Sequence, residues 1–296
     1  MKPVLETFNL SKNYGPLHAV SELNFVLEEG AAFGLLGPNG SGKTTTLGMV
    51  MAVLQPTKGT FKWFGEHPSA TNNKRIGSLL ETPNFYPYLS LFKNLEVIAK
   101  IKEIDNSEIN RVLEETNLIK RSKSRYDTLS LGMKQRLGIA SVLLGKPDVL
   151  LLDEPTNGLD PEGIAEIRNL ILNQKEKGKT IILASHILDE VEKVCSHVGI
   201  LKQGKLIASG KVSELLIGET LIIIKSDKLT ELKNELFGAG LVKSAVINGL
   251  NLEVIPSVNV STTEINRFAI DKGIPITEIF TKKTSLEEQF LEVVRG

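Results

Sequence analysis

The sequence has a single cysteine, no excess of positive or negative charge and no long apolar run. Its only cysteine is Cys195, so no disulfide can form within the chain and a reducing compartment is expected. Lys and Arg total 35, as do Asp and Glu, which argues against a nucleic-acid partner because such partners usually require a basic surface. No apolar run approaches the ~18–20 residues that span a bilayer, and Met1–Glu6 lacks a signal peptide's apolar core. We therefore expect a cytoplasmic protein whose membrane role requires a partner.

The composition and the pattern of apolar runs indicate a globular α/β protein. The chain has 296 residues, of which 41% are apolar and 24% charged, and this length suggests about two domains. Short apolar runs that are typical of buried strands alternate with helical patterns. These runs are Ala32–Leu36, Ile76–Leu80, Val149–Leu152 and Thr180–Ala184. The alternation predicts a mainly parallel sheet with helices on both faces.

The pattern changes after Gly210. The expected order becomes β-α-β-β-α, followed by one more helix. The elements are strands from Leu221 and near 242–247 and 251–255, and helices over Lys228–Phe237, Thr262–Asp271 and Leu286–Val294. We predict two domains, 1–212 and 213–296, the second a small α+β domain.

One segment fills the G-x-x-x-x-G-K-[ST] template of a phosphate-binding P-loop. It follows an apolar run and precedes a helical pattern, as the motif requires, and its glycines allow backbone N–H groups to point at phosphate oxygens. The residues expected to bind nucleotide are Gly37, Pro38, Asn39, Gly40, Ser41, Gly42, Lys43, Thr44 and Thr45. We expect Lys43 to reach the β- and γ-phosphates of ATP, and the Thr44 hydroxyl to ligate Mg²⁺.

Two acids follow the apolar run Val149–Leu152. Asp153 is expected at the tip of a buried strand, where it is placed to hold Mg²⁺. Glu154, one residue on, can orient or deprotonate the attacking water. The alternative is that both carboxylates cap the next helix, but Pro155–Gly158 intervenes and makes capping poor.

The segment Thr128–Gly138 indicates the family. Read alone, Ser130 is an ordinary helix N-cap. Because Asp153 and Glu154 follow some twenty residues later, the segment Thr128–Gly138 resembles the signature motif of ATP-binding-cassette (ABC) ATPases. Other segments match in the same order: Tyr14 the aromatic that stacks on adenine, Asn157–Asp160 the D-loop, and Ser185-His186 the switch histidine. The resemblance covers roughly residues 3–212.

The resemblance implies a P-loop ATPase fold with a parallel core, an antiparallel arm and a helical subdomain. It assigns catalysis to Glu154 and His186, and nucleotide contacts also to Tyr14 and Asp160. It further implies that Ser130 and Gly132 close on ATP held by a second subunit, so that a working enzyme needs a homodimer or a pair with another ATPase subunit.

Two departures from the family pattern indicate which branch of the family the sequence resembles. Leu131 replaces a glycine and Met133 a glutamine of the usual signature, and Glu81 stands where the family has a metal-contacting glutamine. These variations are similar to those of bacitracin and lantibiotic exporters. The C-terminal region that includes Ser285–Phe290 is similar to the accessory tail of ATPases that serve ABC-2-type permeases. We therefore predict an ATPase at the inner face of the membrane that powers a separate exporter permease, with Glu81 as a third metal ligand.

Two other functions stay open at this stage. A non-transport ABC ATPase of the chromosome-structuring kind needs a long coiled coil between P-loop and signature, and only about eighty-five residues lie there. A nucleotide-binding regulatory module with little turnover would fit the altered signature, although Glu154 and His186 count against it.

Overall fold

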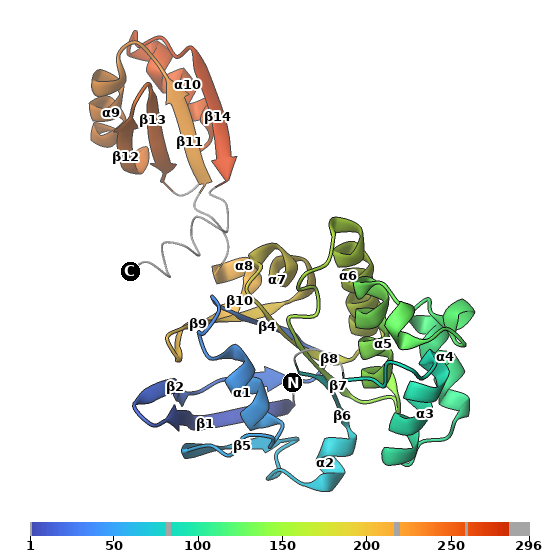
Figure 1. The fold of residues 1–296 in the computed structure, drawn as a ribbon. Helices are drawn as coiled ribbons and strands as arrows, with labels where there is room; N and C mark the ends of the chain where they lie inside the picture. The colour runs from blue at the N-terminus through green and yellow to red at the C-terminus, as the bar shows by residue number, and fades with distance from the viewer. Residues whose placement is uncertain (1, 81–83, 216–219, 258–259, 284–296) are drawn as a thin grey trace. The chain divides into compact units, whose positions relative to one another are not determined.

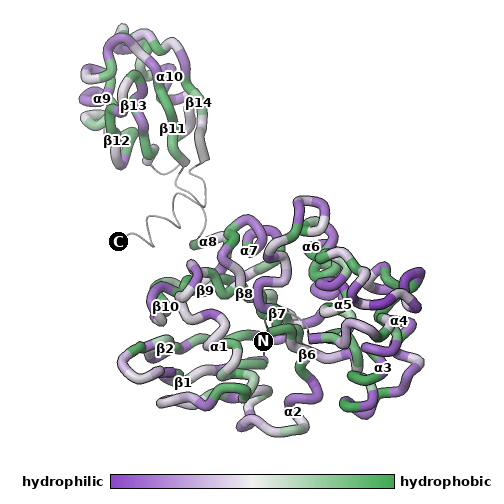
Figure 2. Tube along the Cα trace, viewed as in Figure 1, coloured by the Kyte–Doolittle hydropathy of each residue, from purple (hydrophilic) through white to green (hydrophobic). Residues whose placement is uncertain are grey.

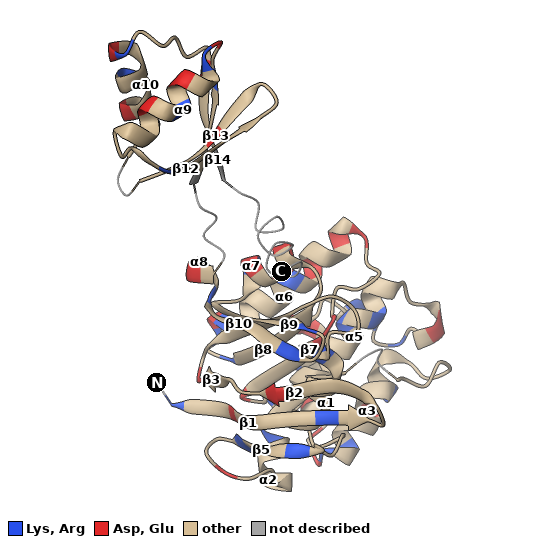
Figure 3. Ribbon diagram, turned by 90° about the vertical axis from the view of Figure 1, so that its left-hand side faces the viewer, with Lys and Arg blue, Asp and Glu red and all other residues tan. Residues whose placement is uncertain are grey.

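The computed structural model describes residues 2–80, 84–215, 220–257 and 260–283. The chain divides into two compact units, Met1–Leu215 and Leu216–Gly296 (Figure 1). In the described ranges, no helix is both long and apolar enough to cross a membrane. Figure 3 shows basic and acidic residues interspersed on both units, in keeping with a formal net charge of zero.

A six-stranded sheet forms the core of the first unit, with strand order β10-β9-β4-β8-β7-β6. Its strands are β4 (Ala32–Leu36), β6 (Ile76–Leu79), β7 (Val149–Asp153), β8 (Thr180–Ser185), β9 (His197–Lys202) and β10 (Lys205–Lys211). Only β10 pairs in the antiparallel sense, with β9. The strands β4, β7 and β8 are buried at every position, and their apolar character is visible in Figure 2. The predicted α/β fold with a mainly parallel sheet is confirmed.

Helices cover both faces of this sheet. On one face Leu47 and Val50 of α1 (Lys43–Val50) join the core cluster that contains Leu35 and Leu151. On the other face α7 (Leu188–Val194) packs closely on β4, because a Cβ built at Gly34 would lie 2.3 Å from Val191 Cγ1. The remaining helices of this unit outside the helical segment described below are α2 (Ala70–Lys74), α6 (Pro161–Glu176) and α8 (Val212–Leu215).

An antiparallel arm and a helical segment complete the first unit. The arm places β1 (Pro3–Tyr14) against β2 (Leu17–Leu23), β3 (Val26–Glu28) and β5 (Lys58–Trp63). Trp63 ties the arm to the P-loop helix, since its buried indole donates a 2.7 Å hydrogen bond to the carbonyl of Val50. The helical segment contains α3 (Leu91–Ile101), α4 (Ser107–Glu115), α5 (Leu131–Leu143) and the short 3₁₀ turns Ile119–Arg121 and Tyr126–Thr128.

The second unit is an antiparallel sheet with strand order β12-β13-β11-β14 and two helices. Its elements are β11 (Thr220–Lys225), α9 (Leu229–Gly238), β12 (Val242–Asn248), β13 (Asn251–Pro256), α10 (Thr262–Asp271) and β14 (Glu278–Lys283). The core joins Ile222 and Val254 of the sheet to Leu236 of α9 and Ile265 of α10. The strand β14 was not predicted, and the helix predicted over Leu286–Val294 lies outside the described residues.

Candidate nucleotide site

Three strands of the core sheet end at one edge, and the predicted site residues follow them there. Leu36 pairs with Ser185 and Asp153 with Ala184, so β4, β8 and β7 finish level with one another. The backbone N–H of Gly37 donates to the Ser185 carbonyl at 3.3 Å. The N–H of Glu154 donates to the Ala184 carbonyl at 2.9 Å. In parallel sheets this carboxyl edge is where ligands bind.

The loop between β4 and α1 is built so that only glycine fits at two of its positions. Gly42, the N-cap of α1, has φ of 105°, and a Cβ there would lie 2.5 Å from the Ala19 carbonyl oxygen. A Cβ at Gly37 would lie 2.4 Å from the Leu201 carbonyl oxygen. A side chain at either position would displace the loop, because real Cβ atoms essentially never come this close to backbone oxygens. The loop also leaves the hydroxyl oxygen of Ser41 buried without a hydrogen-bond partner among the described residues.

Lys43, Glu154 and His186 form a connected polar group at the sheet edge. The Lys43 ammonium is buried, donates to the carbonyls of Gly37 and Pro38 at 2.7 and 3.2 Å, and lies 3.3 Å from Glu154 Oε1. Glu154 Oε2 lies 2.8 Å from His186 Nδ1. Glu154 itself has φ of 47°, a left-handed conformation that is uncommon for a non-glycine residue. The carboxylate is therefore fixed between a cation and an imidazole.

An open cleft of about 600 Å³ borders the loop. Its lining contains Tyr14, Thr44 and Glu154. The full lining is Tyr14, Leu17, His18, Ala19, Asn39, Gly40, Gly42, Lys43, Thr44, Thr45, Glu154 and Gln203. The Tyr14 ring is exposed and lies 5.3 Å from the Lys12 ammonium.

Sequence reasoning missed two polar residues of this cleft, His18 and Gln203. His18 Nδ1 lies 2.9 Å from Asn13 Oδ1 across the β1–β2 hairpin. Gln203 occupies the β9–β10 turn, and the next N–H, of Gly204, donates to the Ser41 carbonyl at 3.0 Å. The Gln-Gly pair was a turn signal, but nothing local indicated that this turn would support the P-loop.

The donor set suits a hard divalent cation such as Mg²⁺. Thr44 offers a hydroxyl oxygen in the cleft, and Asp153 is a buried carboxylate at the end of β7. Among the described residues no group of three or more His, Cys, Asp or Glu side chains has the arrangement of a protein-only metal site. One or two protein oxygens completed by substrate phosphates are the usual Mg²⁺ arrangement. Glu81, the third predicted ligand, lies outside the described residues.

The lining of the cleft lacks the predicted residues Ser130, Gly132 and Asp160, and it also lacks Gly37, Pro38, Ser41, Asp153 and His186. Ser130 is exposed and caps α5, with its hydroxyl accepting from the Met133 N–H at 3.3 Å. Asp160 caps α6 by accepting from the Gly163 N–H at 2.8 Å. Leu131 is half exposed, and its Cδ2 lies 3.3 Å from the Cβ position of Gly158. The signature and D-loop segments therefore lie next to each other on the same chain.

A glycine loop joins the buried parallel strand β4 to α1, which begins with Lys43, and the acid Glu154 follows β7 at the same edge of the sheet. This arrangement defines a P-loop nucleoside triphosphatase. The sequence profile of the ABC transporter family matches residues 20–157. The bacitracin transport ATP-binding protein of Enterococcus faecalis is 35% identical over 309 residues, covering 100% of this chain and 98% of that protein. The lantibiotic transport ATP-binding protein of Streptococcus pyogenes is 39% identical over 204 residues, covering 69% of this chain and 89% of that protein.

A solved structure of an ATP-binding subunit of an ABC transporter matches with a TM-score of 0.65 at 30% identity, covering 72% of this chain and 91% of that one. The chain therefore belongs to the ABC transporter family, as an ATP-binding, ATP-hydrolysing subunit.

Proposed function

We propose that this chain powers a membrane exporter of peptide antibiotics of the bacitracin or lantibiotic kind. The observation that carries this proposal is the match to a bacitracin transport ATP-binding protein over the whole of this chain. The similarity of the tail at Ser285–Phe290 to that of ATPases that serve ABC-2-type permeases supports a permease of that type. The subunit would then act at the inner face of the membrane, held there by the permease.

The P-loop supplies the phosphate contacts in this proposal. Triphosphate oxygens compete with the carbonyls of Gly37 and Pro38 for the Lys43 ammonium, which already lies at the loop. A phosphate oxygen would also give the buried Ser41 hydroxyl a partner. Thr44 and Asp153 would hold Mg²⁺, which neutralises phosphate charge when bound. Tyr14, which lines the same cleft, offers an exposed aromatic face for adenine.

Glu154 takes a proton from the attacking water, and His186 orients Glu154. The Glu154 carboxylate is a general base held in place from both sides, by Lys43 and by His186. Contact with triphosphate would draw Lys43 away from Glu154 and leave an oxygen of the carboxylate available to accept a proton. His186, which contacts that carboxylate, would then keep it oriented and would contact the γ-phosphate.

A complete site requires two copies of the chain. The chain carries one P-loop and one signature, and Ser130 of that signature is exposed at the start of α5. The exposed start of α5 offers a hydroxyl, backbone N–H groups and a helix dipole to an anion. In the proposed dimer these groups contact ATP bound to the partner, and Asp160 lies at the same interface.

The two units have different roles in this proposal. Residues 1–212 form the ATPase domain and residues 213–296 an accessory domain. The division at Leu215 and the family match within residues 20–157 support this assignment. The cluster that surrounds the P-loop helix draws on residues from Val4 to Leu206 alone.

The proposal is tested in a host that lacks the transporter, by expressing this chain together with the permease recovered with it in a pull-down. The wild-type pair should raise resistance to bacitracin or to a lantibiotic, and Lys43→Ala should abolish the effect. Lys193→Gln, which changes an exposed lysine on α7, is the control. Resistance that does not depend on Lys43 would refute the transport proposal.

A further inference from the structure

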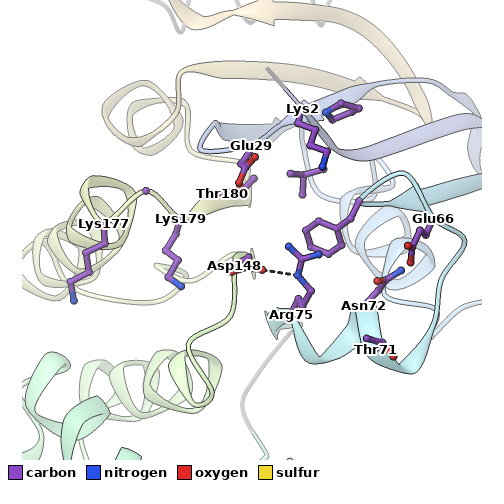
Figure 4. Close-up of a pocket in the computed structure, with 14 residues that line it drawn as sticks. Lys2, Glu29, Glu66, Thr71, Asn72, Arg75, Asp148, Lys177, Lys179 and Thr180 are labelled. Carbon is purple, nitrogen blue, oxygen red and sulfur yellow. Dashed lines mark hydrogen bonds and ion pairs between the residues drawn. The ribbon is translucent and has the colours of Figure 1, made fainter.

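A small cavity with many cationic side chains lies near the opposite edge of the core sheet, where β7 and β8 begin. Its volume is about 210 Å³, and its lining is Arg111, Glu115, Leu143, Lys146, Pro147, Gln174, Lys177 and Lys179. Four of these residues are cations and one is an acid. The cavity shares Lys177 and Lys179 with a neighbouring pocket of about 590 Å³ (Figure 4), where four cations face three acids. The imbalance of charge is therefore concentrated in the smaller cavity.

The acids at this cavity already have ion-pair and hydrogen-bond partners. Glu115 accepts from Arg111 Nη1 at 2.8 Å, from Gln174 Nε2 at 3.0 Å and lies 3.1 Å from the Lys177 ammonium. Burial acts to raise the pKa of Glu115, but these hydrogen bonds outweigh it and lower the pKa, so the group is ionised at neutral pH. Glu108 pairs with Arg111 at 2.6 Å and with Lys146 at 3.0 Å.

The hydrogen-bond acceptors of Lys179 are neutral, so they do not balance its positive charge. Its ammonium donates to the backbone carbonyls of Lys146, at 3.2 Å, and Pro147, which are neutral groups. The neighbouring acid, Asp148, is paired with Arg75 at 2.7 Å, and the Arg75 guanidinium lies over the Phe64 ring at 3.6 Å (Figure 4). Arg111, Lys146, Lys177 and Lys179 carry four positive charges, and Glu108 and Glu115 carry two negative charges. Two positive charges therefore remain in excess.

We propose that this cavity is a binding site for a phosphate-sized dianion, either inorganic phosphate or the phosphate group of a small metabolite. A dianion balances the excess charge, and lysine ammonium groups are strong donors to phosphate oxygens. The cavity is below the roughly 300 Å³ at which pockets for drug-sized ligands begin, so it encloses no more than the phosphate group of a ligand. The bound group joins α4, which carries Arg111, to the end of α6, which leads into Lys177, and so links the helical segment to the core sheet.

The site is tested by calorimetric titration of the full chain with inorganic phosphate. The protein is first saturated with Mg²⁺ and a non-hydrolysable ATP analogue, because the P-loop at Lys43 is itself a phosphate site and ADP would leave its γ-phosphate position open. We expect Lys177→Gln to weaken phosphate binding on the order of tenfold, the loss of one hydrogen bond to a charged group. Lys193→Gln is the matched control, because Lys193 is about as exposed as Lys177 (47% against 52%) and is also paired with an acid.

Further arms identify the ligand and guard against a misfolded variant. Lys146→Gln, on the other side of the cavity, should weaken binding as Lys177→Gln does. Methyl phosphate that binds as well as inorganic phosphate indicates a metabolite's phosphate group, whereas its exclusion indicates the free ion. Equal affinities in Lys177→Gln and Lys193→Gln would overturn the proposal. Heats that potassium chloride reproduces at the same ionic strength would overturn it as well.

Discussion

Replacing Glu154 with glutamine tests the assignment of the general base. The carboxylate lies 3.3 Å from Lys43 and 2.8 Å from His186. Glutamine has the same shape and keeps one acceptor oxygen, so the contacts that position the side chain are largely retained. What is lost is the ability to take a proton from water, a step worth about 10²–10⁴ in rate. We expect ATP hydrolysis to fall on the order of 10²-fold or more, which is about 2.7 kcal/mol of transition-state stabilisation at the lower bound.

Phosphate release from Mg-ATP measures turnover, and calorimetry on the same preparation measures ATP binding. Binding should persist in Glu154→Gln, because the P-loop contacts of Lys43 and the cleft lining at Tyr14 are unchanged. Glu162→Gln, an exposed acid in the first turn of α6, is the matched control and should hydrolyse ATP at the wild-type rate. Unchanged turnover in Glu154→Gln would refute the assignment, and a parallel loss of ATP binding would show that the residue acts in binding instead.

Three further outcomes are expected. Deleting the residues after 219 should leave a folded chain that binds ATP, because the core around the P-loop helix ends at Leu206; insolubility or loss of ATP binding would contradict the division into domains. Burial raises the pKa of the Cys195 thiol to about 12, so the native protein should resist alkylation from pH 7 to about 10 and react at once when unfolded. Glu81→Gln should make ATP binding less dependent on Mg²⁺ in calorimetric titrations, because a carboxylate repels free ATP and attracts the metal; identical metal dependence in both chains would exclude Glu81 as a ligand.

Features encoded by short-range pattern could be predicted. The apolar run Val149–Leu152 became the buried strand β7, and the alternation of such runs with helices was enough for the fold class. Ser130, which reads as a helix N-cap in the sequence, caps α5 at its start at Leu131. These features depend on residues a few positions apart, which is the range over which periodicity and capping act.

Features that depend on strand order could not be predicted. Glu154 meets His186 because β7 pairs with β8. Lys43, in the helix that follows β4, meets Glu154 across β8, which lies between β4 and β7 although it follows both along the chain. No local pattern encodes that order. The edge strand β14 was missed for a related reason, since only its pairing with β11 distinguishes Glu278–Lys283 from a polar loop. Gln203 reaches the cleft only through the β9–β10 hairpin, which no prediction included.

We propose that ATP is bound between two copies of this chain, with Ser130 of one facing the P-loop of the other. Light scattering coupled to gel filtration on Glu154→Gln measures it most directly. With Mg-ATP the mass should be twice the 32.4 kDa of one chain, and with ADP it should be that of a monomer. Adding Ser130→Arg to the same chain should abolish the dimer without abolishing ATP binding. A monomer in Mg-ATP, or a dimer that Ser130→Arg leaves intact, would contradict the account.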